Sequence, residues 1–385
     1  MVLDVTKRAQ QLFVDTFTTS PEFAGSAPGR VELLGNHTDY NGGYVLTAAV
    51  NIRTAVVLRR SSGHSTRICT ELPGCKIAEV VLADGPESLR SEDRWCGYVA
   101  GVLDTFSPEG AHWDVAIASD VPDGSGISSS AAVLVATASA VLAALGRVMS
   151  PMEIAIACRV VENGPWVGAP VGLLDQFSSA CGELGMALFL DCQSYDWKRV
   201  PLDANKLGIL IVNTNVKHAL ADGGGYTTRR RECEAAAMVL TRGRTTLLRD
   251  VTPVEYSLGI DGVEQPSQSR ARHIWDENER VLIGTKYLES DDVVGFGAQL
   301  NASHRSCRTL FENTCPEIDR VQEILEGTNG VFGAKLSGGG WGGSVVAVID
   351  PMFVDDIIAT LTSEYGDGLS FLSTFAANGA TGVQL

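Results

Sequence analysis

The sequence predicts an α+β protein with two domains. The chain has 385 residues, whereas one domain commonly takes about 100–200 residues. Short runs rich in Val, Ile and Thr, typical of strands, occur among longer segments whose apolar residues recur at helical spacing. Polar residues interrupt this pattern near residues 195–207. We therefore expect an N-terminal domain over residues 1–200 and a C-terminal domain over residues 201–385.

The N-terminal half carries the clearest signals for individual elements. The third expected helix has a well-marked start, because Ser150 can cap it, Pro151 takes its first position and Glu153 completes a capping box. Strands are expected over residues 44–60 (two adjoining strands), 77–81 and 114–119, and helices over residues 93–106, 130–145 and 151–162.

The C-terminal half repeats the mixture of strands and helices. Residues 252–270 have no periodicity and contain two prolines and two glycines, so we expect a loop there. Strands are expected over residues 207–213, 334–336 and 344–349, and helices over residues 229–240, 276–288 and 291–309.

Charge and composition exclude several classes of function. Lys and Arg number 30 against 46 Asp and Glu, giving a net charge of −16, so we expect neither a nucleic-acid partner nor an anionic membrane. The most apolar stretch, residues 131–145, is shorter than the roughly 20 residues of a membrane span. Residues 1–15 lack the apolar core of a secretory signal. The nine cysteines form no C-x-x-C pair, so we expect free thiols and a cytoplasmic protein.

A glycine- and serine-rich segment, VPDGSGISSSAA, occupies residues 121–132 directly before an expected helix. Glycines permit backbone conformations that a Cβ forbids, and the helix N-terminus offers unpaired N–H groups and a partial positive charge. Together they predict a phosphate site. It is neither a P-loop, because no Lys follows the glycines, nor a Rossmann fingerprint, because Ser129 stands where the third glycine belongs.

Two further segments are rich in glycine or polar residues. Residues 337–343 read SGGGWGG, and five glycines around one Trp indicate that a backbone approaches something closely. Residues 29–43 read GRVELLGNHTDYNGG, where Arg30, His37, Asp39 and Tyr40 predict a loop that holds a ligand rich in hydroxyl groups.

Asp175 lies in GAPVGLLDQF, residues 168–177. This carboxylate can be an ordinary N-cap of a helix or a positioned functional group, and composition leaves both interpretations open.

Together these segments resemble those of the GHMP small-molecule kinases, and among them the galactokinase family. Residues 29–43 look like the galactokinase signature at the sugar site, and residues 121–132 look like the ATP phosphate loop. AKLSGGGWGGSVV, residues 334–346, looks like the third motif of the family. The similarity continues between these motifs in the same order over nearly the whole chain.

The resemblance implies the two-domain GHMP fold, with an active site in the cleft between domains. It also implies phosphoryl transfer from ATP, with Mg²⁺, to the anomeric hydroxyl of a small-molecule sugar. Trp95 and Tyr98 would flank the adenine, and Ser130 and Glu162 would hold the metal ion. The remaining implied roles are catalysis by Asp175 and Arg30, sugar binding by Asn36, His37, Asp39, Gly172 and Tyr226, and phosphate binding by Gly124, Ser125, Gly126, Ser128, Ser129 and Ser130.

The chain departs from the family pattern in two places. Asn36 stands where the galactokinases have a Glu that contacts the far end of the sugar. This leaves open a kinase for another aldose, such as an N-acetylhexosamine, a uronic acid or a pentose. The stretch from Glu162 to Asp175 is also one residue longer than usual, at residues 163–165. A sugar sensor without activity is a further alternative, but the intact phosphate loop and Asp175 favour an enzyme.

Overall fold

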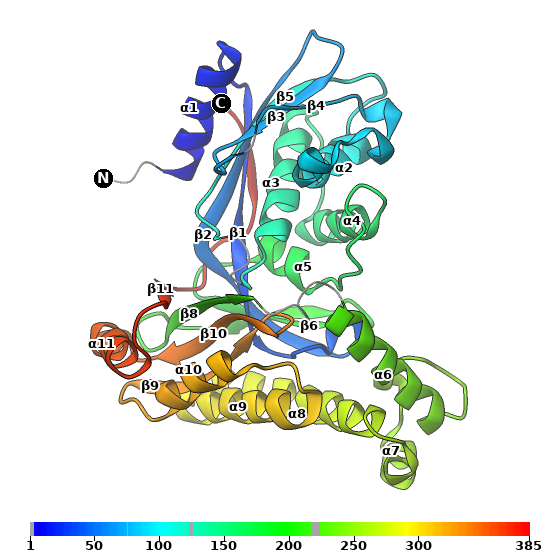
Figure 1. Cartoon of the computed structure of the whole chain (residues 1–385), viewed down its shortest axis with the longest axis vertical. Helices are drawn as coiled ribbons and strands as arrows, with labels where there is room; N and C mark the ends of the chain where they lie inside the picture. The colour runs from blue at the N-terminus through cyan, green and yellow to red at the C-terminus, as the bar shows by residue number, and fades with distance from the viewer. Residues whose placement is uncertain (1–3, 75, 123–125, 218–223) are drawn as a thin grey trace.

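The structure is a computed structural model that describes residues 4–74, 76–122, 126–217 and 224–385. These residues form two lobes, each built on one sheet (Figure 1). An eight-stranded sheet has the order β12-β1-β2-β5-β3-β4, with β6 added to β2 and β7 added to β6. A four-stranded sheet has the order β11-β8-β10-β9.

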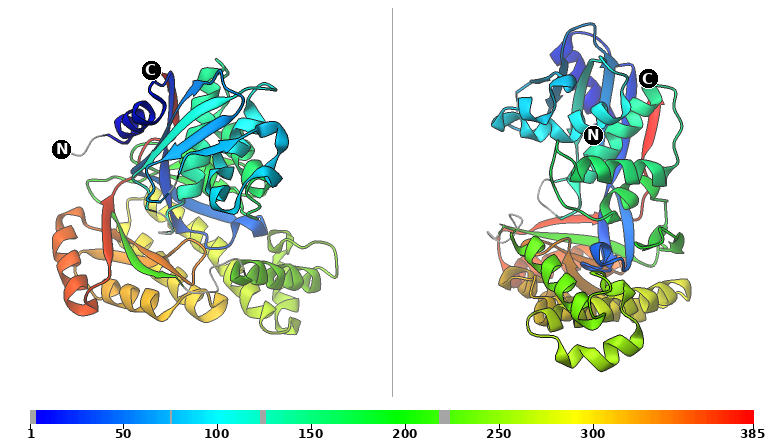
Figure 2. Two further views of the ribbon diagram at one scale, coloured as in Figure 1. Left: turned by 45° about the horizontal axis from the view of Figure 1, so that its top comes forward. Right: turned by 90° about the vertical axis from the view of Figure 1, so that its right-hand side faces the viewer.

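Two long strands, β1 (Phe23–Leu34) and β2 (Tyr44–Arg60), form the centre of the larger sheet and reach from one lobe toward the other (Figure 2). The expectation of two adjoining strands within residues 44–60 is wrong. The segment stays one strand because one edge pairs with β1 at residues 46–49 and 53–58. Its other edge pairs with β6 over residues 44–47 and with β5 over residues 54–60. The other strands of this sheet are β3 (Thr66–Thr70), β4 (Ala78–Val80), β5 (Trp113–Ser119), β6 (Met186–Asp191), β7 (Trp197–Pro201) and β12 (Thr381–Gln384).

Helices cover both faces of this sheet (Figure 1). One face carries α1 (Val5–Phe17), and the other carries α2 (Gly97–Phe106), α3 (Ser129–Ala144), α4 (Pro151–Asn163) and α5 (Leu174–Cys181). Helix α3 is rich in Ala and lies so close to β1 that a Cβ at Gly25 would come within 2.0 Å of the Ala136 carbonyl oxygen. The capping box predicted for Ser150 and Glu153 is confirmed at the start of α4.

The smaller sheet contains β8 (Gly208–Lys217), β9 (Val331–Ser337), β10 (Gly342–Ile349) and β11 (Ser370–Thr374). The loop expected over residues 252–270 is wrong. Thr252 and Glu255 form a capping box, Pro253 starts a short helix, and none of that helix's residues is buried, so it shows no apolar periodicity. The helices of this lobe are α6 (Gly224–Leu240), α7 (Pro253–Gly259), α8 (Ser267–Glu289), α9 (Val293–Ser306), α10 (Pro316–Glu326) and α11 (Val354–Tyr365).

The lobes share apolar contacts. Val31 and Leu34 at the end of β1 belong to one buried cluster with Val281 of α8 and Phe296 of α9. The chain passes from the larger sheet to the smaller one between β7 and β8, and β12 then returns to pair with β1. The domain boundary at residue 200 stays a prediction. No helix within the described residues has the length and apolar character needed to span a membrane.

Candidate active site

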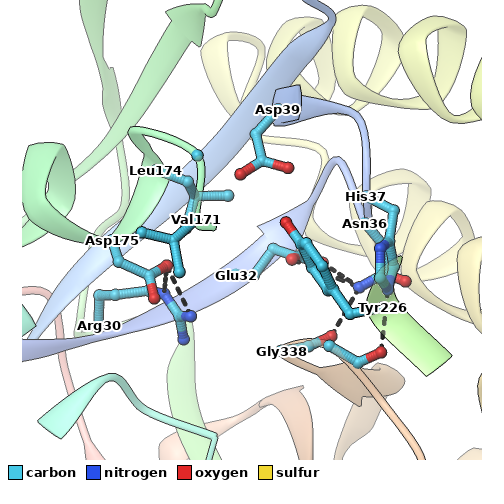
Figure 3. Close-up of a pocket in the computed structure, with 12 residues that line it drawn as sticks. Arg30, Glu32, Asn36, His37, Asp39, Val171, Leu174, Asp175, Tyr226 and Gly338 are labelled. Atoms are coloured by element: carbon cyan, nitrogen blue, oxygen red, sulfur yellow. Dashed lines mark hydrogen bonds and ion pairs between the residues drawn. The ribbon is translucent and has the colours of Figure 1, made fainter. Parts of the chain in front are cut away.

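A cavity of about 230 Å³ opens where the two lobes meet. Its walls come from β1, the loop after β1, the start of α5, the start of α6 and the turn between β9 and β10 (Figure 3). The lining residues are Arg30, Glu32, Asn36, His37, Asp39, Val171, Gly172, Leu174, Asp175, Tyr226, Gly338 and Gly339. Seven residues that the sequence predicted for catalysis or sugar binding are therefore brought together in one cavity.

Asp175 is a positioned carboxylate. It is the second residue of α5, and Leu173 takes the N-cap position. The Arg30 guanidinium donates from Nε and Nη2 to Oδ1, at 2.7 Å each, and from Nη1 to the Gly126 carbonyl oxygen at 2.7 Å. The Ser128 hydroxyl donates to Oδ2 at 2.5 Å. The Asp175 side chain remains 25% exposed, so a ligand in the cavity can reach it.

Asp39 and Gly172 both line the cavity, and the Asp39 carboxylate packs closely against the backbone of Gly172. A Cβ at residue 172 would lie 1.9 Å from Asp39 Oδ2, so only glycine permits this approach. Burial raises the pKa of Asp39 to about 7, and the nearby carboxylate of Asp175 adds to the increase. Figure 3 shows the Asp39 carboxylate directed into the cavity, where it can accept hydrogen bonds from a ligand.

An aromatic cluster sets the position of Tyr226. Its ring centroid lies 5.2 Å from that of His37 and 5.1 Å from that of Tyr40. His37 Nε2 donates to the Gly339 carbonyl oxygen at 2.9 Å, and its Nδ1 accepts from the Tyr40 hydroxyl at 2.9 Å. Burial lowers the pKa of His37 to about 3. His37 is thus a neutral wall residue whose two ring nitrogens already have protein partners.

The side-chain amide of Asn36 makes all its hydrogen bonds to other protein groups. Its Nδ2 donates to Glu32 Oε1 at 3.0 Å and to the Gly338 carbonyl oxygen at 2.9 Å. Its Oδ1 accepts from Asn313 Nδ2 at 2.9 Å and from the Cys307 thiol at 3.3 Å. Asn36 is fully buried, so it reaches the cavity mainly through the neighbours that it holds.

A second cavity, of about 300 Å³, lies beside the N-terminus of α3. It brings together Trp95, Tyr98, Ser129 and Ser130, four of the residues predicted for ATP. The rest of its wall is formed by the apolar residues Leu72, Ile117, Val121 and Val133 and the polar residues Thr70, Glu71 and Ser119.

The phosphate loop joins the two cavities. Ser128 has a left-handed backbone, with φ of 60°, and its hydroxyl points to Asp175 rather than into the second cavity. Gly126 also has a positive φ, of 73°, and its carbonyl oxygen accepts from Arg30. The predicted phosphate-binding residues Gly124 and Ser125 lie outside the described residues.

Ser130, which lines the second cavity, forms an oxygen-rich pair with the buried Glu162. The Ser130 hydroxyl and the Gln176 amide both hydrogen-bond to the Glu162 carboxylate. Burial raises the pKa of Glu162 to about 7, and the nearby charge of Asp175 adds to the increase. The buried Gln176 Oε1 has no hydrogen-bond partner within the described residues. A carboxylate and a hydroxyl are the hard ligands that a partly hydrated Mg²⁺ accepts.

No cluster of three His, Cys, Asp or Glu in the described parts of the chain has the arrangement of a metal cage. Mg²⁺ in nucleotide sites usually takes only one or two protein ligands and completes its shell with phosphate and water. The Ser130–Glu162 pair therefore fits that kind of site.

Five lining residues were not predicted by the sequence analysis: the apolar Val171 and Leu174, and Glu32, Gly338 and Gly339. Glu32 lies two residues after Arg30 on β1, and strand alternation puts both side chains on one face, which was the available signal. Gly338 and Gly339 belong to the second glycine run, whose close approach was predicted without a place in the site. Gly338 contributes the carbonyl oxygen that binds Asn36, and Gly339 the one that binds His37.

Comparison with known protein families gives three matches along the chain. A galactokinase galactose-binding signature matches residues 11–60. The GHMP kinase N-terminal domain matches residues 97–183, and the GHMP kinase C-terminal domain matches residues 285–367.

Individual proteins agree with these matches. Human galactokinase is 34% identical, over 98% of this chain and 97% of its own length. The galactokinase of Clostridium acetobutylicum is 32% identical, over 97% of each chain. The crystal structure of Lactococcus lactis galactokinase with galactose superposes with a TM-score of 0.89 at 28% identity, covering 98% of this chain and all of that one. Mevalonate kinase from Methanococcus jannaschii, at 15% identity and a TM-score of 0.68, shares the fold.

Proposed function

Because this chain belongs to the galactokinase family of the GHMP kinases, we propose that it transfers the terminal phosphoryl group of ATP to the anomeric hydroxyl of galactose. One observation carries the proposal. Three consecutive serines connect the two cavities: Ser128 binds the Asp175 carboxylate in one, and Ser129 and Ser130 line the other. A sugar hydroxyl at Asp175 would thus lie beside the phosphate loop.

In this mechanism Asp175 accepts the proton of the attacking hydroxyl. Its Oδ1 is occupied by Arg30. Within the described residues Oδ2 accepts from Ser128 alone, so it keeps a lone pair for the sugar. An aspartate is a weak base for an alcohol, but the hydroxyl becomes acidic as its bond to phosphorus forms. A late proton transfer therefore suits this group.

Arg30 orients Asp175 and offsets negative charge on the phosphoryl group in transit. Its three hydrogen bonds, to Asp175 and Gly126, fix the guanidinium between the carboxylate and the phosphate loop. Phosphoryl transfer has a loose transition state, so catalysis comes mostly from positioning and charge stabilisation. The N-terminus of α3 adds a partial positive charge near the leaving phosphates.

Binding of the two substrates is assigned to separate groups. Asp39 and Tyr226 hold sugar hydroxyls, with the close backbone of Gly172 beside them and His37 as a supporting wall. Trp95 and Tyr98 flank the adenine in the second cavity. Ser130 and Glu162 would hold Mg²⁺, which when bound neutralises charge on the nucleotide phosphates. The free thiols of the eight described cysteines support a reducing compartment such as the cytoplasm.

The test is release of ADP with a panel of sugars: galactose, an N-acetylhexosamine, a uronic acid and arabinose. We expect galactose to give the highest kcat/KM. Turnover of another aldose without galactose would overturn the assigned substrate. Binding of galactose and ATP without ADP release would overturn the enzyme and favour a sensor.

A further inference from the structure

Glu32 and Arg30 point into the same cavity from β1 (Figure 3). The strand is regular between them, with Arg30 opposite Ala49 and Glu32 opposite Thr47, so the two residues are separated by about 7 Å along the strand. That spacing approximates the length of a hexose with its substituents. With the anomeric hydroxyl at Asp175, beside Arg30, Glu32 lies where the far end of the sugar would be.

A buried lysine holds the Glu32 carboxylate. Lys335 Nζ donates to Glu32 Oε1 at 2.7 Å and to the Leu336 carbonyl oxygen at 2.8 Å, and its side chain is fully buried. Burial, the largest single effect, lowers the pKa of Lys335, but Glu32, Cys307 and Glu277 together outweigh it, so that the net pKa is raised. The site thus contains a buried ion pair whose negative member borders the cavity.

The two oxygens of Glu32 differ in their partners. Oε1 receives both good hydrogen bonds, from Lys335 at 2.7 Å and from Asn36 at 3.0 Å. Among the residues that the structure describes, Oε2 has only a long contact of 3.4 Å, with Asn36 Nδ2. A carboxylate oxygen can accept two hydrogen bonds, so Oε2 retains acceptor capacity.

Asn36 has no such capacity left. Its Oδ1 already accepts from Asn313 and Cys307, and its Nδ2 donates to Glu32 and Gly338. Its backbone is fixed as well: Glu277 accepts from its N–H at 3.2 Å, and the His273 ring lies 3.1 Å from its carbonyl oxygen. Asn36 is therefore a positioning residue for Glu32.

We propose that Glu32, held by Lys335 and Asn36, accepts a hydrogen bond from a sugar hydroxyl remote from the anomeric carbon and so determines substrate specificity. This inference rests on the proposed function. It moves recognition of the far end of the sugar from residue 36, where the sequence placed it, to residue 32. It also disfavours a uronic acid, because a second carboxylate near Glu32 would be repelled.

The test is a double-substitution cycle between residue 32 and the sugar hydroxyls. kcat/KM is measured for galactose and its 2-, 3-, 4- and 6-deoxy derivatives with the wild-type enzyme and with Glu32→Gln. We expect one deoxy sugar to lose about 10- to 100-fold with the wild type, as for a hydrogen bond to a charged group. In Glu32→Gln that loss should shrink to within a few-fold. The effect should appear in KM more than in kcat, because the contact is remote from the reacting atoms.

Asp39→Asn is the matched control, since it removes a different carboxylate of the same cavity. For the deoxy sugar whose loss shrinks in Glu32→Gln, Asp39→Asn should keep the full wild-type loss of kcat/KM relative to galactose. The proposal would be overturned if, for every deoxy sugar, the loss of kcat/KM relative to galactose were the same in Glu32→Gln as in the wild type.

Glu32→Gln leaves Lys335 without its counter-ion, so Tm is measured alongside the kinetics. If Glu32→Gln unfolds, Glu32→Gln/Lys335→Met removes both charges together and the cycle is run on that variant. If the wild-type enzyme uses another aldose, the deoxy series of that sugar is used. In that case the proposal of galactose as substrate is wrong, but the deoxy series of the other sugar still tests the role of Glu32.

Discussion

The Ser128 hydroxyl donates to Asp175 Oδ2 at 2.5 Å, which fastens the carboxylate of the sugar cavity to the loop that precedes α3. Ser128 adopts a left-handed backbone that is uncommon for a residue with a side chain, and its hydroxyl makes no capping hydrogen bond to the helix. Its side chain is therefore committed to Asp175. This contact separates the roles of neighbouring serines and makes them testable one by one.

Asp175→Asn should lower kcat by about 10²–10⁴-fold, the usual contribution of a general base. The change is nearly isosteric, so Tm and the thermal shift caused by Mg-ATP should stay close to those of the wild type. Asp356→Asn is the control, because it makes the same replacement at an exposed position of α11. An Asp175→Asn enzyme within a few-fold of the wild type would make that carboxylate structural.

Ser128→Ala and Ser130→Ala should have different effects although the residues are two apart. Ser128→Ala removes one hydrogen bond to Asp175 and should lower kcat by about 10-fold, with an unchanged Mg²⁺ titration. Ser130→Ala should move that titration to higher Mg²⁺ concentration, since it removes a proposed ligand. Titrations of activity against Mg²⁺ for both variants provide the measurement. Identical titration curves would take Ser130 out of the metal site.

Gly172→Ala should weaken sugar binding without affecting nucleotide binding. The new Cβ would lie 1.9 Å from Asp39 Oδ2, so the Asp39 carboxylate must move away from the sugar. We expect KM for galactose to rise by about 10-fold or more, the loss of one charge-assisted hydrogen bond. Gly262→Ala serves as control, because a Cβ at that residue meets nothing within 4 Å. The prediction fails if both alanine variants give the same KM.

The pH dependence of sugar binding should report Asp39. Burial raises its pKa to about 7, and the ionised form is the better acceptor for sugar hydroxyls. With Mg-ATP saturating, KM for galactose should therefore rise as pH falls below about 7. In Asp39→Asn this dependence should be lost. A wild-type KM that is flat between pH 5.5 and 8, to within about twofold, would contradict the assignment.

The same pKa shift makes a prediction about stability. The folded pKa of Asp39, about 7, lies above its ordinary value of 3.8, so the folded protein binds the proton more tightly than the unfolded chain does. This contribution is complete below pH 3.8 and is lost as pH rises through 7. Asp39→Asn should therefore raise the free energy of unfolding of the ligand-free protein more at pH 8 than at pH 5, relative to the wild type.

Residues 32 and 36 should behave as one unit. Asn36→Glu restores the residue usual in the family, but it brings a second carboxylate beside Glu32, and two carboxylates in one site cannot both ionise readily. We expect kcat/KM for galactose to fall by at least about 10-fold. The exchange Glu32→Asn/Asn36→Glu keeps one carboxylate and one amide near Lys335 and should recover most of the activity. A double variant as poor as Asn36→Glu would show that the two positions act independently.

Residues of the sugar cavity could be predicted from the sequence where they lie together in one motif. Arg30, His37 and Asp39 occupy one short segment, and the glycines and serines before α3 indicate a phosphate loop by themselves. The environment of Asn36 could not be predicted in this way. Its partners Cys307 and Asn313 are more than 270 positions away, and the lysine that holds Glu32 is 303 positions from it.

Two elements were predicted wrongly because their structure depends on contacts with segments that are distant in the sequence. Helix α7 has no fully buried residue and packs on its lobe mainly through the half-buried Tyr256, so its seven residues show no apolar period. Strand β2 pairs on one edge first with β6 and then with β5, and a change of partner that depends on distant segments leaves no signal in the sequence of the strand. Local signals were sufficient where the cause is local, as at the capping box of α4.

The central claim is transfer to the anomeric hydroxyl of galactose with Asp175 as the base. It is tested most directly by ³¹P NMR of the product formed by the wild-type enzyme from galactose, ATP and Mg²⁺. The account predicts one new phosphomonoester signal, coupled to the anomeric proton, that appears together with ADP and is lost with Asp175→Asn. A phosphate on any other hydroxyl, or the same product formed at an undiminished rate by Asp175→Asn, would contradict it.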